Sequence, residues 1–402
     1  MVARRLLAAM EQGLWIRQMF EEGQHLVDTY GPENVFDFSI GNPVLEPPPE
    51  FHKALIQILQ SDRKGLHRYM PSVGLPEVRQ NLASQLNKKH KLPFTQNHLM
   101  LCVGAGGGMN TVLKTLVDPG DEVIVFKPYF PEYRNYIANF QGVMREVATT
   151  HDFQLDFATL ESALSDKTCA VIINSPNNPS GAVYSEQELE TLGDLLFKVS
   201  QKRRAPVYLI SDEPYSTIMF DGKTCPSPMD YYEHTIMVTS FSKSLAIPGE
   251  RIGYIAISPS AYEARDIFRA LGSAHLALGF VNAPALMQRV LPLLGEMTVN
   301  FSSYQFNRDR IAEIFERIKL PCIKPKGAFY FFPKTPIEDD ILFAKEALKH
   351  RVVLVPGTAF GVHGHVRLSF CVESEKVEKS LSSLAAVFAS TVDKKEASEL
   401  ML

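Results

Sequence analysis

Lys243 is the residue of this chain whose type and position suggest covalent chemistry. It lies among the serines of SFSKSLAIPGERIGY, residues 240–254, just after an apolar run that ends near Thr239. We predict a loop at this position. An amine becomes a nucleophile when burial or neighbouring cations lower its pKa, and such a lysine can form a Schiff base. A lone lysine in a loop is nevertheless more often a solvated surface residue, so its surroundings must decide.

A second polar cluster, SDEPYS, begins at Ser211 directly after the apolar run VYLI. Asp212 could keep a heterocyclic nitrogen protonated through a charge-assisted hydrogen bond, and Tyr215 follows three residues later. The alternative for this aspartate is a helix cap or a structural ion pair.

Two glycine- or asparagine-rich segments could bind an anion. NSPNNPSG, residues 174–181, has the composition of a tight turn, and its asparagine side chains could donate to an oxyanion. VGAGGGMN, residues 103–110, opens a predicted helix, where backbone N–H groups and the helix dipole favour a phosphate. It is not the dinucleotide fingerprint, because Met109 replaces the third glycine, and it lacks the GK[ST] of a P-loop.

Arg367 could bind a carboxylate from the second half of the chain. It lies in VRLSF, a strand-like segment, and arginine is suited to bidentate carboxylate binding. A buried structural ion pair is an equal alternative. The 11 histidines are scattered, and even His363 and His365, in the turn GVHGHV, show no metal-ligand spacing, so we predict no metal site.

Short apolar runs and amphipathic segments alternate between about residues 51 and 290, and these elements must position the polar clusters. The runs are rich in β-branched residues, as is typical of strands buried on both faces of a mainly parallel sheet; they cover residues 121–126, 169–174, 207–211, 235–240 and 254–258. Segments such as 185–202 predict the helices between them. The pattern indicates an α/β fold with right-handed crossovers, whose ligands bind beyond the carboxyl ends of the strands.

The pattern changes after about residue 301. A long predicted helix leads to apolar runs at 327–333, 352–357 and 366–370 and then to a final helix. We therefore predict three parts: residues 1–47 form an N-terminal segment that joins the small domain, residues 48–290 form a large domain, and residues 291–402 form a smaller α+β domain.

Composition restricts the possible partners. The chain has 402 residues, of which 45% are hydrophobic, and its net charge of −4 argues against nucleic acid or an anionic membrane as a partner. The five cysteines are far apart and form no CxxC pair, which favours a reducing compartment. The N-terminal residues predict an amphipathic helix rather than a signal peptide, and no run of about 18 apolar residues occurs. We expect a cytoplasmic protein.

The polar clusters, taken together and in this order from Gly41 to Arg367, resemble the class I and II aminotransferases. These are aspartate-aminotransferase-like enzymes of fold type I that use pyridoxal 5′-phosphate (PLP). The resemblance covers nearly the whole chain and implies that residues 48–290 form the PLP-binding domain. The chain departs from the family pattern at Phe130, Ser180 and Pro214, but none of these changes removes a group that the chemistry needs.

The resemblance assigns a role to each of these residues. Lys243 forms the Schiff base with PLP, Asp212 pairs with the ring nitrogen, and Tyr215 completes the catalytic set. The further cofactor contacts that it implies are Ala105, Gly106, Ser240 and Arg251 at the phosphate, Phe130 stacked on the ring, Asn178 with Tyr215 at the phenolic oxygen, and Tyr69 at the phosphate of the neighbouring subunit. Gly41, Asn178 and Arg367 hold the substrate α-carboxylate. The role of Tyr69 implies a homodimer.

The implied reaction moves an amino group from an L-amino acid to a 2-oxo acid by a ping-pong mechanism, with the freed lysine as general base. Overall likeness favours aspartate or glutamate paired with 2-oxoglutarate. The sequence leaves open the donor, the acceptor and the cation for a side-chain carboxylate. A PLP-dependent C–S β-lyase or a decarboxylase would use the same residues. A PLP-binding regulator would need a DNA-binding domain, which the one helix predicted before Gly41 does not provide. The plainest alternative is an α/β protein whose polar loops are coincidental.

Overall fold

The structure is a computed structural model that describes residues 2–61 and 64–389, except for the side chains of residues 4, 5 and 7–14. A seven-stranded sheet has the order β2-β8-β7-β6-β5-β3-β4. The strands, in chain order, are β2 (Leu99–Cys102), β3 (Glu122–Phe126), β4 (Val143–Val147), β5 (Thr168–Asn174), β6 (Tyr208–Asp212), β7 (Thr235–Ser240) and β8 (Gly253–Ile257). They run parallel from β7 to β4, whereas β8 is antiparallel to both β7 and β2. The predicted mainly parallel α/β sheet is confirmed.

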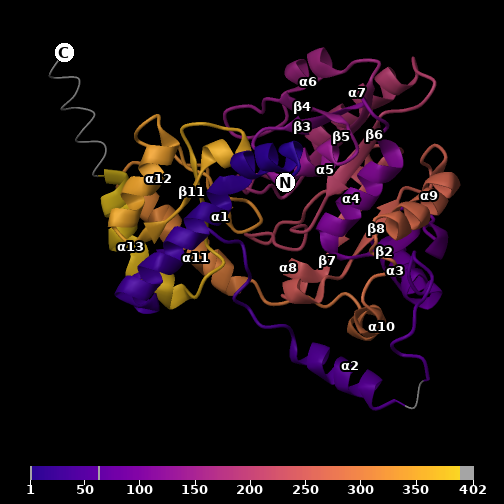
Figure 1. Ribbon diagram of the computed structural model, residues 1–402, viewed down its shortest axis with the longest axis horizontal. Coiled ribbons are helices and arrows are strands. Elements are labelled where there is room, and N and C mark those ends of the chain that lie inside the picture. The colour runs from indigo at the N-terminus through magenta and orange to yellow at the C-terminus, as the bar shows by residue number, and fades with distance from the viewer. Residues whose placement is uncertain (1, 62–63, 390–402) are drawn as a thin grey trace.

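Helices cover both faces of this sheet (Figure 1). Alternate residues of the inner strands point to opposite faces, so that Val171 packs toward one helical layer and Ile172 toward the other. One layer contains α4 (Gly104–Leu116), α5 (Glu132–Ala138) and α9 (Ala264–Ala277), and the other contains α6 (Phe157–Ala163) and α7 (Glu186–Ser200). Burial on both faces explains why these strands are continuous apolar runs.

A third hydrophobic cluster lies at the β2 end of the sheet. It is built by α2 (Pro49–Leu59), α3 (Pro76–Lys89) and α10 (Ala285–Leu294). The strands β2 and β4 were not among the predicted runs. In β4 the sequence VMREV is mostly exposed, because the strand lies at the edge of the sheet and carries no continuous apolar pattern.

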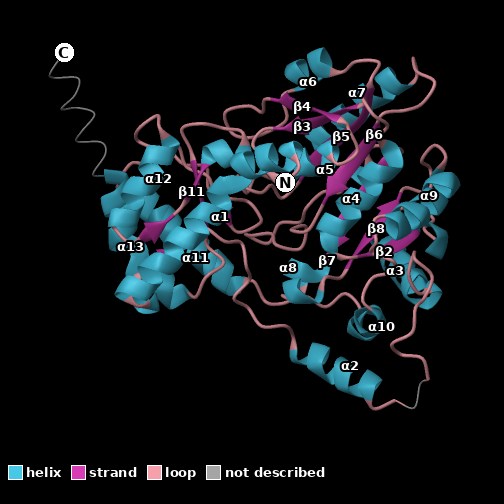
Figure 2. Cartoon of the chain, in the orientation of Figure 1, coloured by secondary structure: helices cyan, strands magenta, loops and turns pink. Residues whose placement is uncertain are grey.

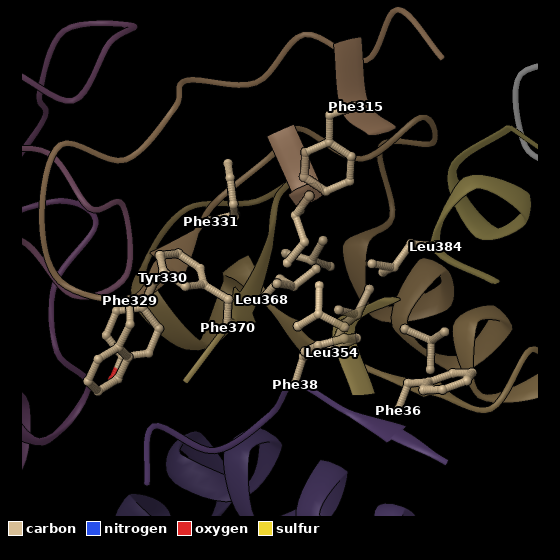
Figure 3. Close-up of a cluster of buried hydrophobic side chains, with 14 of the residues drawn as sticks. Phe36, Phe38, Phe315, Phe329, Tyr330, Phe331, Leu354, Leu368, Phe370 and Leu384 are labelled. Carbon is tan, nitrogen blue, oxygen red and sulfur yellow. The ribbon is translucent and has the colours of Figure 1, made fainter. Parts of the chain in front are cut away.

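The C-terminal part forms a second body at the other end of the molecule. Its three-stranded sheet pairs β11 (Val355–Pro356) with β12 (Val366–Ser369) and β12 with β9 (Tyr330–Phe331), all antiparallel. The helices α11 (Ser302–Arg317), α12 (Asp340–Lys349) and α13 (Ser374–Ala389) surround an aromatic core (Figures 1 and 3). A single core of this kind makes the second body a rigid support for the residues on β9 and β12.

The N-terminal segment packs on this second body. Strand β1 (Phe36–Asp37) pairs in parallel with β10 (Val352–Val353), and Phe36 and Phe38 enter the aromatic core (Figure 3). Helix α1 (Arg4–Tyr30) lies across the same body in Figure 1. This packing is compatible with an N-terminal segment that joins the small domain, while the boundaries at residues 47 and 290 stay predictions.

Lys243 lies in a short helix, α8 (Phe241–Ser244), so the predicted loop is wrong. The helix forms directly after β7, with Ser240 as its N-terminal flanking residue, and the Leu245 amide continues the pattern by bonding to the Phe241 carbonyl oxygen. Ser242 and Ser244, two of the serines around Lys243, lie within this single turn. The remaining short helices are η1 (Pro32–Asn34), η2 (Gln96–His98), η3 (Pro228–Asp230), η4 (Pro248–Glu250) and η5 (Gly357–Phe360). Among the described residues, no helix combines the length and the apolar character needed to cross a membrane.

Candidate active site

A cavity of about 640 Å³ lies between the two bodies, beyond the carboxyl ends of β5, β6 and β7. Figure 2 shows these strands ending toward the region around α8. Eleven of the twelve site residues predicted from the sequence line this cavity: Gly41, Ala105, Gly106, Phe130, Asn178, Asp212, Tyr215, Ser240, Lys243, Arg251 and Arg367. The fold therefore brings together residues that are up to 326 positions apart, from Gly41 to Arg367.

One end of the cavity is suited to an anion. Helix α4 begins at Gly104, so its first backbone N–H groups, with the positive end of the helix dipole, face the lining at Ala105 and Gly106. The Arg251 guanidinium lies against the same turn, because a Cβ on Gly104 would be only 2.7 Å from its Nη2. Gly104 also has a φ of +64°, which favours glycine. Helix terminus and cation together make an anion-binding corner.

Asp212 is buried at the end of β6 with half of its carboxylate unpaired. Its Oδ2 accepts a hydrogen bond from the Tyr133 hydroxyl, whereas Oδ1 has no hydrogen-bond partner in the described part of the chain. Burial raises the pKa of Asp212 to about 7, and the nearby Glu213 carboxylate acts in the same direction. A buried carboxylate oxygen without a partner is costly unless a donor arrives from the cavity. The side chain is therefore prepared for a cationic N–H group.

Lys243 lines the same cavity as Asp212, with its amine directed at the N-terminal segment. The Nζ atom donates to the Gly41 carbonyl oxygen at 2.7 Å and lies 5.5 Å from the centre of the Phe329 ring. Desolvation lowers the pKa of Lys243 to about 8, and the positive charges of Arg367 and Arg251 add to this shift. An amine with such a pKa is partly neutral near pH 8, which is the form that attacks a carbonyl carbon.

Arg367 is buried at 3% exposure, and its hydrogen-bond partners among the described residues include no carboxylate. Its guanidinium lies 4.8 Å from the ring centres of both Tyr330 and Phe360. Nη1 donates to Asn178 Oδ1 at 3.1 Å and Nη2 to the Ser39 carbonyl oxygen at 2.5 Å, while Nε is unpartnered within the same described set. Burial lowers the pKa of Arg367, so an incoming carboxylate would compensate for lost hydration.

Asn178 and Tyr215 connect these charged groups. The backbone N–H of Asn178 donates to Asn174 Oδ1 at 2.7 Å, and Asn174 Nδ2 in turn donates to the Asp212 carbonyl oxygen at 2.8 Å. The Tyr215 and Tyr330 hydroxyls lie 2.9 Å apart. Burial raises the pKa of Tyr215 well above its ordinary value, so its hydroxyl stays protonated and can donate.

Several residues that line the cavity or hold its lining residues were not found from the sequence. Tyr133 holds Asp212, Tyr136 and Glu132 line the wall beside Phe130, and Tyr330 contacts Arg367. Tyr133 and Tyr136 lie three residues apart on one face of α5, directly after Phe130, so helical spacing could have indicated them. Tyr330 lies between two buried phenylalanines, and nothing in that apolar run marks it as functional.

Helix α1 closes part of the mouth of the cavity with Ile16, Arg17 and Phe20. The Arg17 Nε atom donates to Glu21 Oε1 at 2.8 Å in an exposed pair of the same helix. The sequence analysis gave this helix no part in the site. Arg17 is a further cation of the described lining, besides Lys243, Arg251 and Arg367.

Tyr69 is the predicted site residue that the structure does not bring to the cavity. Its side chain is 87% exposed, and the residue is not part of the lining. The prediction placed its hydroxyl in the site of a neighbouring subunit, and a single chain leaves that role untested.

Comparison with known proteins agrees with this geometry. The family model described as Aminotransferase class I and II matches residues 33–384. A probable aspartate/prephenate aminotransferase of Aquifex aeolicus is 31% identical over 365 residues, which cover 87% of this chain and 89% of the relative. A solved aminotransferase of Eubacterium rectale is 37% identical with a TM-score of 0.91, covering 94% of this chain and 95% of its own. The aspartate aminotransferase of Thermus thermophilus, solved with maleate, is 28% identical with a TM-score of 0.82, covering 93% and 96%.

Proposed function

This chain belongs to the class I and II aminotransferases, and we propose that it uses PLP, held at Lys243, to move an amino group from an L-amino acid to a 2-oxo acid. The observation that supports this proposal most directly is the unpartnered carboxylate oxygen of Asp212, buried in the same cavity as the depressed-pKa amine of Lys243. An acid–amine pair of this kind has no evident structural purpose in a cavity wall.

The donor set fits the parts of PLP. The N-terminus of α4, with Arg251 and Ser240, offers N–H and O–H donors to a phosphate. The free Asp212 oxygen can accept from a protonated pyridine nitrogen. Phe130 presents an aromatic ring to the cavity. When bound, PLP supplies an electron sink for the negative charge that develops on the substrate α-carbon.

The residues of this chain supply binding, orientation and proton transfer. Arg367 would bind the substrate α-carboxylate with its free Nε, beside the backbone of Gly41, and so fix the substrate relative to the Lys243 amine. Lys243, once free, would take the proton from the α-carbon as general base. Asp212 would keep the proton on the ring nitrogen, and Tyr215 with Asn178 would donate to the phenolic oxygen of the cofactor.

We propose aspartate as the donor and 2-oxoglutarate as the acceptor, with Arg17 as the cation for the side-chain carboxylate. Among the cations of the described lining, Lys243, Arg251 and Arg367 already have roles, and Arg17 lies at the mouth of the cavity. Its present partner is Glu21, in an exposed pair of a kind that contributes only about 0.2–1 kcal/mol, so a substrate carboxylate can replace it. Relatives named aspartate aminotransferases support this choice of donor.

The test is a single-turnover half-reaction of the PLP-loaded protein with a panel of amino acids, with the oxo-acid product identified. Aspartate should react fastest, and the product should be oxaloacetate. Pyruvate with released thiol from a sulfur amino acid would instead assign a C–S β-lyase. Borohydride reduction followed by peptide mass spectrometry should place the cofactor on Lys243, and an unmodified Lys243 peptide would refute the proposed role.

Arg17→Gln tests the side-chain cation. We expect kcat/KM for aspartate to fall roughly tenfold, equivalent to about 1.4 kcal/mol, with little change for alanine. Glu21→Gln is the matched control, because it frees Arg17 and should leave aspartate turnover equal or higher. If Arg17→Gln lowered kcat/KM equally for aspartate and for alanine, Arg17 would not be the cation that binds the side-chain carboxylate.

We also propose a cytoplasmic homodimer in which Tyr69 reaches the phosphate of the partner's cofactor. The large exposed fraction of Tyr69 leaves its hydroxyl available to a second copy. Sedimentation should give a dimer. Tyr69→Phe should weaken PLP binding, and the variant should remain a dimer. A monomer with full activity would contradict this proposal.

A further inference from the structure

Tyr330 contacts three groups of the proposed site at once, although the proposed function gives it no task. It lies on β9, is 2% exposed, and lines the cavity. Figure 3 shows Tyr330 and Phe329 next to each other at one side of the aromatic cluster, away from Leu384. The antiparallel pairing of Tyr330 with Ser369, two residues after Arg367, fixes its backbone to the strand that carries Arg367.

The hydroxyl and the ring of Tyr330 contact different residues of the site. Its hydroxyl lies 2.9 Å from the Tyr215 hydroxyl, and its ring centre is 4.8 Å from the Arg367 guanidinium carbon. The same hydroxyl packs on Gly41, since a Cβ there would be 2.1 Å from the Tyr330 oxygen. Gly41 is also the residue whose carbonyl oxygen accepts from Lys243. One side chain therefore contacts residues proposed to hold the substrate carboxylate and a residue proposed to hold the cofactor.

The donor direction follows from the number of available protons. Each tyrosine hydroxyl has a single proton, and either of the two can donate in the structure as it stands. If Tyr215 gives its proton to the phenolic oxygen of PLP, then its own oxygen must accept from Tyr330. A hydroxyl that accepts one hydrogen bond becomes a stronger donor in the next, because the chain of hydrogen bonds polarises.

We propose that Tyr330 is a positioning residue that donates to the Tyr215 oxygen, strengthens the donation of Tyr215 to the cofactor, and links this hydrogen bond to the packing of Arg367. The inference rests on the proposed function, because it needs PLP in the cavity. The hydroxyl of Tyr330 acts on Tyr215, and its ring supports Arg367. These two parts can be separated by Tyr330→Phe, which keeps the ring and removes the hydroxyl.

The readout is the pH midpoint at which the visible absorption band of the PLP-loaded protein changes. A hydrogen bond to the phenolic oxygen stabilises the deprotonated form of the chromophore, so weakening it raises the midpoint. Tyr330→Phe keeps the hydrogen bond from Tyr215 to the phenolic oxygen and only weakens it. A polarisation effect of about 10–30% on one charge-assisted hydrogen bond corresponds to an upward shift of about 0.1–0.6 pH unit. Affinity for a dicarboxylate that cannot react, such as maleate, should change less than threefold, because the ring under Arg367 remains.

Tyr304→Phe is the matched control. Tyr304 is a buried tyrosine of the same aromatic cluster and packs on Phe329 with ring centres 5.7 Å apart, but its hydroxyl bonds to neither Tyr215 nor Tyr330 in the described structure. Its midpoint should equal that of the unmodified protein. A shift in Tyr304→Phe as large as in Tyr330→Phe would mean that loss of any cluster hydroxyl is sufficient, and would overturn the proposal.

A double variant keeps the test decisive if Tyr330→Phe is poorly folded. Tyr215→Phe/Tyr330→Phe removes both hydroxyls and leaves no buried oxygen without its partner. Its midpoint should equal that of Tyr215→Phe alone, because Tyr330 acts only through the Tyr215 oxygen. Additive shifts, or an unshifted midpoint in folded, PLP-loaded Tyr330→Phe, would overturn the inference. Absence of any visible band from the unmodified protein would instead refute the proposed function.

Discussion

The two walls of the cavity are built in different ways. The wall proposed for the cofactor consists of the ends of neighbouring strands of the seven-stranded sheet and the N-terminus of α4, which packs on that sheet. The wall proposed for the substrate carboxylate combines residues 39–41 with Tyr330 on β9 and Arg367 on β12, which come from distant parts of the chain. The first wall follows from the topology of one sheet, whereas the second exists only after the N-terminal segment has packed on the C-terminal body.

The two walls also differ in how their arginines are held. Arg251 is exposed and bonds to the Pro248 carbonyl oxygen at 2.9 Å. Arg367 is buried between two aromatic rings, and two of its nitrogens are fixed by Asn178 and Ser39. A buried cation that is already oriented loses little freedom on binding, but its desolvation must be compensated by an anion. The carboxylate wall is therefore expected to be more selective and less tolerant of change than the phosphate corner.

Lys243 is in contact with both walls, and its loss should have the largest effect. We expect Lys243→Ala to lower turnover by more than the roughly 10²–10⁴-fold of a lost general base, because the covalent link to the cofactor is lost as well. Steady-state transamination and borohydride labelling measure the two losses separately. Lys223→Ala, which changes an exposed lysine, is the control. Near-normal turnover of Lys243→Ala would contradict the proposed mechanism.

Asp212 tests the cofactor wall. Asp212→Asn keeps the shape of the side chain but removes the charge that would hold the ring proton, so we expect turnover to fall at least roughly 100-fold. Burial raises the pKa of Asp212 to about 7, so at pH 8 the unloaded protein carries an ionised, partly unpaired carboxylate. The unloaded variant should therefore melt at an equal or higher temperature at pH 8. A strong loss of thermal stability would indicate a structural role instead.

The two arginines provide a direct comparison of the walls. Arg367→Lys should raise KM for the amino acid and the oxo acid alike by roughly 30-fold, or about 2 kcal/mol, because lysine cannot reproduce the fixed fork in a buried position. Arg251→Lys should weaken PLP binding by roughly tenfold or less, because the exposed site tolerates a point charge, and should leave KM nearly unchanged. If Arg367→Lys and Arg251→Lys changed KM equally, the proposal that Arg367 binds the substrate carboxylate and Arg251 the phosphate would be contradicted.

The difference between the walls also explains how much the sequence could predict. Asp212 ends a buried strand, and Asn178 and Lys243 follow buried strands. The rule that ligands bind beyond the carboxyl ends of such strands placed them together. Arg367 was singled out from its residue type as a possible carboxylate-binding residue, whereas Gly41 was found only through family resemblance. The proximity of the two could not be predicted, since it depends on packing between distant segments. Tyr330 was missed because β9 is buried on both sides and has no polar pattern. Tyr133 was missed because its partner is Asp212, 79 residues away.

His275 provides the smallest expected effect and concerns only the cofactor wall. It is fully buried on α9 against α4. The Thr111 hydroxyl donates to the Gly107 carbonyl oxygen at 2.8 Å, so its oxygen accepts from His275 Nδ1–H at 3.1 Å. Nε2 then has no partner in the described part of the chain and lies near Phe280, whose ring centre is 5.1 Å from that of His275. Protonation of Nε2 would place an unpaired charge behind the helix proposed to bind phosphate.

Burial accordingly lowers the pKa of His275 to about 4, against about 6.5 in an unfolded chain. Between these values the unfolded chain binds more protons, so this contribution to stability is complete above pH 6.5 and is lost as the pH falls toward 4. The loss should be about 2 kcal/mol at pH 5. The glutamine of His275→Gln does not titrate, so the difference in melting temperature between variant and unmodified protein should narrow between pH 7 and pH 5. As the pH falls, the unmodified protein should also release PLP at a pH at which it has not yet melted. A constant difference across this range would show that α4 is not weakened through His275, and acid sensitivity of the phosphate corner would then need another titrating group.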